Sequence, residues 1–142
     1  MPLIDTHSHL YLPQFENDLD EVIERCLAAE VRKVFLPNID SSTISGLNNL
    51  CHKKPDMFYP MMGLHPCSVK ENFKEELSIA KRHLNAEKYI AVGEIGLDYY
   101  WDTTFKSQQI EALKEQVNWA KAQELPVVIH CRNSFNDLFE TL

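Results

Sequence analysis

The sequence predicts an α/β fold of the (β/α)8 TIM-barrel type, of which residues 1–142 supply about the first five β/α units as one partial barrel domain. Two observations support this prediction. Short segments rich in Val, Ile, Phe and Tyr alternate with longer segments of helical period, which is the pattern of parallel β/α units. His and Glu residues also lie at or just past the ends of these short segments, where a (β/α) barrel places its active site.

Five apolar segments are each short enough to form a buried parallel strand. The predicted strands are residues 3–7, 33–37, 58–64, 89–94 and 126–130.

The segments between and after these strands carry apolar residues at helical spacing. The first helix has Asn17 or Asp18 as its N-cap, and the second begins at Ser41 or Ser42. Trp119 on the fourth helix is expected to cover the core. The apolar residues at helical spacing are, in chain order, Phe15, Leu19, Val22, Ile23, Cys26 and Leu27; Ile44, Leu47 and Leu50; Phe73, Leu77, Ala80 and Leu84; Ile110, Leu113, Val117 and Ala120; and Phe135, Leu138, Phe139 and Leu142. Those of the second and third helices are expected to be buried.

Five β/α units are too few to close a barrel, which typically needs about 250 residues. The structural alternative is an open five-stranded sheet of the flavodoxin type. A barrel that stops after its fifth strand has an unpaired edge at its first and fifth strands, so we expect self-association there. The chain is then either part of a longer protein or a truncated, noncatalytic metal-binding half-barrel.

The composition is that of an ordinary globular protein, with 44% hydrophobic and 25% charged residues. There is no membrane-spanning apolar run and no signal peptide, so we expect a cytoplasmic protein with no membrane partner. The four cysteines form no C-x-x-C pair and are expected to be free thiols. A net charge of −7 argues against a protein that coats nucleic acid through a broad basic face.

Four of the six histidines lie at or just past the ends of predicted strands: His7, His9, His65 and His130. The strand period of two directs His7 and His9 to the same side, where two imidazoles can chelate one cation. Packing or surface exposure is the alternative for such a pair. The other two histidines, His52 and His83, fall on helices among basic residues, where solvent exposure is expected.

Glu94 follows an apolar segment, so its carboxylate would face the end of the barrel core. A buried carboxylate without a partner is costly, and metal coordination offsets that cost. The alternatives are an ion pair with Arg132 or a turn cap at Gly96. His130, taken alone, could simply bond to a neighbouring strand. Together, strands that end in His, Glu and His provide the imidazole and carboxylate set of Zn, Mn or Fe sites.

Four segments combine these residues into a more specific series. They read Ile-Asp-Thr-His-Ser-His-Leu (4–10), Gly-Leu-His-Pro (63–66), Val-Gly-Glu-Ile-Gly-Leu-Asp-Tyr (92–99) and Val-Ile-His-Cys-Arg (128–132). The series resembles the signature of the TatD family of metal-dependent deoxyribonucleases, in the family's order and over the whole chain. The Gly-Glu-Ile-Gly-Leu-Asp-Tyr run with flanking His segments is highly specific.

The resemblance implies an amidohydrolase-type barrel with two divalent metal ions, which could be Zn, Mg or Mn. His7 and His9 would bind the first metal, Glu94 would bridge the pair and His130 would bind the second. His65 and Arg132 would lie close to a substrate phosphate, and His65 could instead orient water. Family members carry a further metal-binding His on strand six and an Asp on strand eight. Both would lie beyond residue 142, so we expect this chain alone to be a poor nuclease.

The implied activity is hydrolysis of DNA phosphodiesters by a metal-bound hydroxide, with Glu94, His65 and Arg132 as catalytic residues. Single strands or 3′ ends are the candidate substrates. Other amidohydrolase-type activities compete with this prediction, because the same nucleophile attacks carbonyl carbon. They include hydrolysis of an ester, lactone or amide bond and deacylation of D-aminoacyl-tRNA.

Three aromatic residues, Tyr99, Tyr100 and Trp101, follow Glu94 in the next loop. They could stack on unpaired bases or cover the barrel mouth. We predict that Tyr99 and Asp98 contact substrate together with His65 and Arg132. Asp98 could also cap the loop or hold a catalytic partner. Strand alternation should direct Cys131 away from the His130 side, where we expect it to pack.

Overall fold

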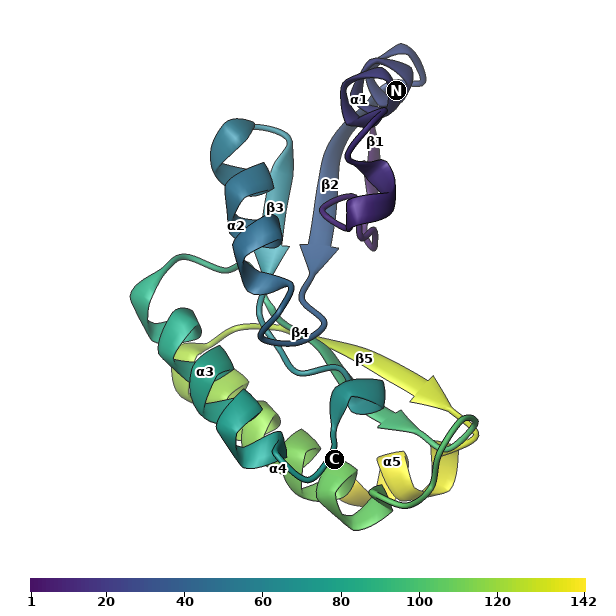
Figure 1. Ribbon diagram of the computed structural model, residues 1–142, viewed down its shortest axis with the longest axis vertical. Coiled ribbons are helices and arrows are strands. Elements are labelled where there is room, and N and C mark those ends of the chain that lie inside the picture. The colour runs from purple at the N-terminus through teal and green to yellow at the C-terminus, as the bar shows by residue number, and fades with distance from the viewer.

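The computed structural model describes all residues 1–142 and confirms the predicted alternation of strands and helices (Figure 1). The strands are β1 (Leu3–Asp5), β2 (Val31–Pro37), β3 (Phe58–Met61), β4 (Val92–Asp98) and β5 (Val127–Arg132). The helices are α1 (Leu19–Ala28), α2 (Ile44–Lys53), α3 (Phe73–Ala86), α4 (Lys106–Gln123) and α5 (Phe135–Thr141). Two short 3-10 helices, η1 (Pro13–Phe15) and η2 (Pro66–Ser68), lie in the connections after β1 and β3.

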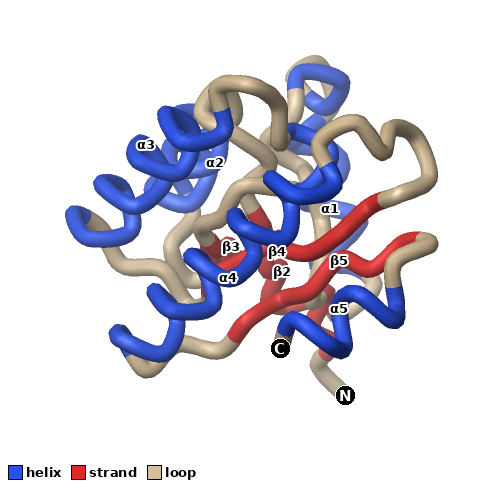
Figure 2. Tube along the Cα trace, turned by 90° about the horizontal axis from the view of Figure 1, so that it is seen from below, coloured by secondary structure: helices blue, strands red, loops and turns tan.

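The strands are parallel and follow one another in space in the order of the chain. β1, β2 and β3 form one sheet, β4 and β5 form another, and a single bridge between Met62 and Val92 joins the two. Figure 2 shows the strands in the interior with the helices around them. The flavodoxin-type alternative interchanges its first two strands, so the observed order excludes it. The sheet does not close into a complete barrel.

The hydrophobic core lies between the strands and the inner faces of the helices, and it contains the predicted residues of α2 and α3, whereas Leu27 of α1 is 40% exposed. Its most buried members include Leu36 of β2, Leu47 of α2, Leu77 of α3 and Leu113 of α4, none more than 1% exposed. Trp119 is buried in the same core, which confirms its predicted role. None of the helices combines the length with the apolar character that crossing a membrane requires.

Several elements differ from their predicted bounds: β1 and β3 end at Asp5 and Met61, before the predicted residues 7 and 64, and β4 and α2 are also shifted. β4 starts at Val92 and continues to Asp98, so Glu94 is its third residue and not its end. All seven residues of β4 are buried, and the two glycines and two carboxylates among them hide the strand pattern in the sequence. α2 begins at Ile44 because the Thr43 hydroxyl accepts hydrogen bonds from the Ile39 and Asp40 backbone and forms a turn there.

Helix α4 is rotated relative to the predicted apolar stripe. Ile110 and Val117 are only half-buried, whereas Gln109 and Gln116 are 3% and 1% exposed. Their amides bond to backbone groups of other segments, which is what allows a polar side chain to occupy the inner face. The prediction that Cys131 packs is wrong, because the residue is exposed and lines a surface hollow beside α5. All four cysteines are free thiols, as predicted.

The two sides where the sheet is open expose apolar side chains. Leu3 and Ile4 of β1 are 47% and 53% exposed, and Ile129 of β5 is 37% exposed. On α5, Phe135 and Phe139 stack with ring centres 6.3 Å apart and are 70% and 77% exposed. The open edges are therefore as expected, while self-association through them stays a prediction.

Candidate metal centre

Glu94 is the centre of a cluster of four histidines at the carboxyl end of the sheet. Its side chain is buried, and the residue is 6% exposed. Its carboxylate oxygens lie 2.9 Å from Nε2 of His7, 3.0 Å from Nδ1 of His130, and 3.8 Å from Nε2 of both His9 and His65. No ion pair joins Glu94 to Arg132, so that alternative does not hold. All four histidines that follow predicted strands thus converge on the one buried carboxylate.

Two groups of three potential ligands share Glu94. His7, His9 and Glu94 form one, and His65, Glu94 and His130 form the other; within each group the ligand atoms lie within 4.8 Å of one another. Imidazole nitrogen and carboxylate oxygen are ligands that suit Zn and Mn. Burial works to raise the pKa of Glu94, but the His130 hydrogen bond and the nearby His65 and His7 lower it overall. An ionised, buried carboxylate among imidazoles fits a divalent cation.

The segment after β1 directs His7 and His9 to this cluster. The backbone N–H of His7 donates to Asp5 Oδ1, and that of Ser8 donates to the Phe35 carbonyl of β2. The two imidazoles lie on the same side with ring centres 5.3 Å apart, as predicted, although the strand ends at Asp5 and neither histidine belongs to it. Tethering to the end of β2 therefore fixes both rings beside Glu94.

Tyr11, which the sequence did not single out, fixes the tautomer of His9. The Tyr11 hydroxyl donates its only proton to the Pro37 carbonyl, and its oxygen lies 2.8 Å from Nδ1 of His9. Nδ1 of His9 must therefore be the donor, which leaves the Nε2 lone pair free and directed towards Glu94. Burial and the nearby His7 lower the pKa of His9. A neutral ring with a free Nε2 is the form that binds a metal.

His65 has the opposite tautomer. Its Nδ1 accepts a hydrogen bond of 3.1 Å from the Cys67 backbone N–H at the start of η2. Burial lowers the pKa of His65 to about 4, so at neutral pH the ring is neutral and its proton is on Nε2. Nε2 of His65 lies close enough to the Glu94 carboxylate for both to bind one cation, but this nitrogen carries a proton. This geometry favours the predicted contact with a substrate phosphate over metal ligation.

His130 lies between two carboxylates. Its Nδ1 is 3.0 Å from Glu94 Oε1 and its Nε2 is 2.7 Å from Asp98 Oδ2. The hydrogen bond to Glu94 raises the pKa of His130, and Asp98 adds to the effect although burial opposes it. The other Asp98 oxygen accepts the Tyr100 backbone N–H at 2.9 Å. Asp98, 2% exposed, thus combines the two roles that the sequence left open: it caps the loop and holds His130.

The close approach of β4 and β5 depends on two glycines. Gly96 is paired with His130 in the register of the two strands and has a φ of 149°. A Cβ on Gly96 would lie 1.9 Å from the His130 carbonyl oxygen, and one on Gly93 would lie 2.8 Å from the Val128 side chain. Larger residues would therefore push β5 away and remove His130 from Glu94.

Two buried glutamines on α4 hold the backbone beside the cluster. Gln116 accepts the Leu64 N–H at 2.7 Å and donates to the Leu64 carbonyl at 3.3 Å, next to His65. Gln109 bonds to the N–H and carbonyl of Asp98 in the same way, at 2.8 and 3.1 Å. Neither glutamine was predicted from the sequence, although their spacing of seven residues on the apolar face of one helix is a detectable signal.

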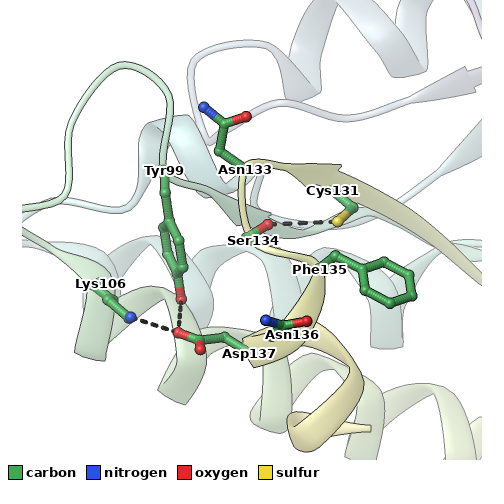
Figure 3. A pocket seen from close by; sticks show the side chains of 8 residues that line it. All are labelled: Tyr99, Lys106, Cys131, Asn133, Ser134, Phe135, Asn136 and Asp137. Atoms are coloured by element: carbon green, nitrogen blue, oxygen red, sulfur yellow. Dashed lines mark hydrogen bonds and ion pairs between the residues drawn. The ribbon is translucent and has the colours of Figure 1, made fainter.

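Tyr99 lies apart from the cluster. Its hydroxyl donates to Asp137 of α5 at 2.9 Å, and Lys106 lies 2.7 Å from the same carboxylate (Figure 3). These residues line a hollow of about 520 Å³ between α5, β5 and the loop after β4. A substrate contact by Tyr99 would therefore be made in this hollow and not beside Glu94.

The remaining histidines lie away from the cluster, as expected. His52 and His83 form surface ion pairs with Glu87 at 3.6 and 3.7 Å. Arg132 is exposed and stacks on Tyr100, with no ion pair to a carboxylate.

Comparison with known proteins places this geometry in a family. The family model described as "TatD related DNase" matches residues 4–142. An uncharacterised metal-dependent hydrolase, YabD, of Bacillus subtilis is 36% identical over 99% of this chain and 54% of its own length. The 3'-5' ssDNA/RNA exonuclease TatD of Erwinia billingiae is 25% identical, also over 99% of this chain and 54% of its own length.

A solved structure agrees with the fold. The crystal structure of YjjV, a TatD homologue from Escherichia coli K12, matches with a TM-score of 0.87 at 31% identity, covering 96% of this chain and 53% of that one. The chain thus spans about half the length of the relatives it matches. The arrangement of parallel β/α units is that of about half of a TatD barrel. The chain belongs to the TatD-related family of metal-dependent hydrolases.

Proposed function

We propose that these residues form the larger share of a two-metal hydrolase site that cleaves phosphodiester bonds of single-stranded DNA. The observation that carries the proposal is the buried Glu94 carboxylate, which contacts four imidazoles and belongs to both potential ligand groups. A shared carboxylate between two groups of ligands is the arrangement expected of a bridged metal pair.

In this proposal His7, His9 and Glu94 hold the first cation, and Glu94 and His130 hold the second. Divalent cations at these positions would activate water and neutralise charge on phosphate oxygens. His65 donates from Nε2 to a phosphate oxygen, which the Cys67 hydrogen bond to its Nδ1 makes possible. Asp98 orients His130, as carboxylates behind metal-binding imidazoles commonly do.

The relatives support metal dependence more strongly than they support a nucleic-acid substrate. The 36% identical relative is named only as a metal-dependent hydrolase, whereas the relative named as a 3'-5' ssDNA/RNA exonuclease is 25% identical. The choice of phosphodiester over carbonyl substrates therefore rests on the description of the family model as a DNase, on the more distant relative and on the donor groups of His65 and Arg132.

The first test is metal content. We expect Glu94→Gln to lose bound Zn²⁺ or Mn²⁺ after dialysis, measured by elemental analysis against the wild-type chain. Glu87→Gln is the matched control, because Glu87 also pairs with two histidines but lies at the surface and belongs to neither ligand group. Equal metal content in wild type and Glu94→Gln would contradict the bridging role.

The second test is substrate choice. We expect prolonged incubation with end-labelled single-stranded DNA and Mn²⁺ to give cleavage that EDTA and Glu94→Gln abolish. A carboxylic ester substrate under the same conditions should react more slowly. Metal-dependent ester hydrolysis without DNA cleavage would assign the site to the competing amidohydrolase-type chemistry.

A further inference from the structure

Two exposed aromatic side chains project from the loop that follows β4. Tyr100 is 51% and Trp101 is 73% exposed, and their rings meet edge to face with centres 4.7 Å apart. The guanidinium carbon of Arg132 lies 3.7 Å from the centre of the Tyr100 ring and 5.4 Å from that of Trp101. We call these three residues the aromatic platform. Most of the surface of both side chains is accessible to a ligand.

The aromatic platform is attached to the metal centre through Asp98. One Asp98 oxygen accepts the Tyr100 N–H and the other contacts Nε2 of His130. Asp98 and Arg132 are paired in the register of β4 and β5, and the Tyr99 N–H donates to the Arg132 carbonyl at 2.9 Å. The platform therefore has a fixed position beside a proposed metal ligand.

The chemistry of the platform selects a flat ligand that carries an anionic group. An open indole face stacks on any nucleobase, and a guanidinium donates hydrogen bonds to phosphate oxygens. In a duplex the faces of the bases are covered by their neighbours, so a stacking site of this kind takes an unpaired base. The net charge of −7 gives little general attraction for the phosphodiester backbone of a nucleic acid. Most of the binding free energy must therefore come from stacking.

We infer that the aromatic platform binds an unpaired nucleobase of the strand that is cleaved at the metal centre, with Arg132 on an adjacent phosphate. This inference deepens the proposed function and rests on it for the identity of the substrate. It assigns single-strand preference to Trp101 and Tyr100, which are not metal ligands. Binding should therefore be measurable without metal and without turnover.

The test is fluorescence anisotropy of labelled oligothymidylate with the wild-type chain in EDTA. An abasic oligomer of equal length should bind more weakly, and Trp101→Leu should weaken binding of oligothymidylate by roughly 5- to 150-fold. Trp101→Phe restores an aromatic face and should recover much of the loss. Phe135→Leu is the matched control, because Phe135 is also an exposed aromatic residue but has no arginine on its ring. A single phosphate contact predicts a shallow salt dependence, with a slope of about −0.7 in a log–log plot.

Several results would overturn the inference. They are equal affinity for abasic and thymidine oligomers, unchanged affinity in Trp101→Leu, an equal loss in Phe135→Leu, or no binding by the wild-type chain. A dimer that forms without DNA and is lost in Trp101→Leu would assign the platform to a second copy of the chain instead. The metal content of Trp101→Leu should equal that of wild type. The DNA-binding test can therefore be interpreted even if the Glu94→Gln metal test fails, and the metal test can be interpreted even if the DNA-binding test fails.

Discussion

Replacing Gln116 by methionine should destabilise the fold far more than the same change at an exposed glutamine of α4. Met has a similar length and no strong hydrogen-bonding group. The change removes the acceptor of the Leu64 N–H and the donor to the Leu64 carbonyl. Leu64 is 1% exposed, so water does not replace either partner.

The magnitude follows from these two groups. A buried backbone group without a partner costs about 1–3 kcal/mol. The second of the two bonds is long, and the methionine side chain gains some apolar burial, so we expect a loss of about 2–4 kcal/mol in the free energy of unfolding. This is a large part of the roughly 5–15 kcal/mol that stabilises a typical domain. It corresponds to a fall in Tm of about 4–16 °C.

Urea unfolding followed by circular dichroism at low protein concentration measures this loss. Gln123→Met is the control on the same helix, because the Gln123 amide is exposed and bonds only to Asn85. The control should stay within about 0.5 kcal/mol of wild type. If Gln116→Met also stays within about 0.5 kcal/mol of wild type with an unchanged m value, the Gln116 amide does not stabilise the fold through Leu64.

Three further predictions concern the metal centre and the open sheet. Tyr11→Phe should weaken Mn²⁺ or Zn²⁺ binding by about 10-fold or more in calorimetry, because His9 loses the hydroxyl that fixes its tautomer. The control Tyr59→Phe should leave metal binding unchanged, because the Tyr59 hydroxyl bonds only to the Asp56 carbonyl. The Glu94 hydrogen bond raises the pKa of His130 in the folded chain. The protonated ring therefore stabilises the metal-free fold fully at pH values below about 6.5, the pKa of histidine in the unfolded chain. This stabilisation is lost as the pH rises through the raised pKa of the folded chain. Urea unfolding of the metal-free chain should show that decline, and a flat profile there would refute the assignment. Phe139→Lys should reduce self-association, measured by light scattering after size exclusion, because Phe139 is 77% exposed on α5.

The order and type of the elements could be predicted from local patterns, and β4 is the most informative departure. Period and composition located α1 and α3 because one face of each is apolar and the other charged. They failed at β4, where Gly93, Glu94 and Gly96 interrupt the apolar run. Those residues are required by contacts with β5 and with the cluster, which are remote in the sequence. A strand that carries the site departs from the pattern of an ordinary core strand.

The ligand residues could be predicted, but the groups that orient them could not. His7, Glu94 and His130 were predicted because each closes an apolar segment of the sequence, although Glu94 and His130 lie inside β4 and β5 in the structure. Tyr11 bonds to a carbonyl 26 residues away and Gln116 bonds to a backbone segment 52 residues away, and no periodicity records such contacts. The direction of a side chain cannot be predicted from sequence position alone either. Tyr99 directly follows Asp98, but its hydroxyl points to Asp137 and not to the cluster.

The tautomers of His9 and His65 lead to a last prediction about stoichiometry. His9 offers a free Nε2, so His7, His9 and Glu94 make a complete three-ligand group within this chain. His65 accepts at Nδ1 and carries its proton on Nε2, which leaves only Glu94 and His130 for a second cation. Calorimetric titration of the 142-residue chain with Zn²⁺ should therefore show one tight site and a second, much weaker one. Converting Cys67 to proline would remove the N–H that His65 accepts, and the second site should then strengthen as the ring exchanges its proton between nitrogens. Two equally tight sites in the unmodified chain would contradict the tautomer assigned to His65.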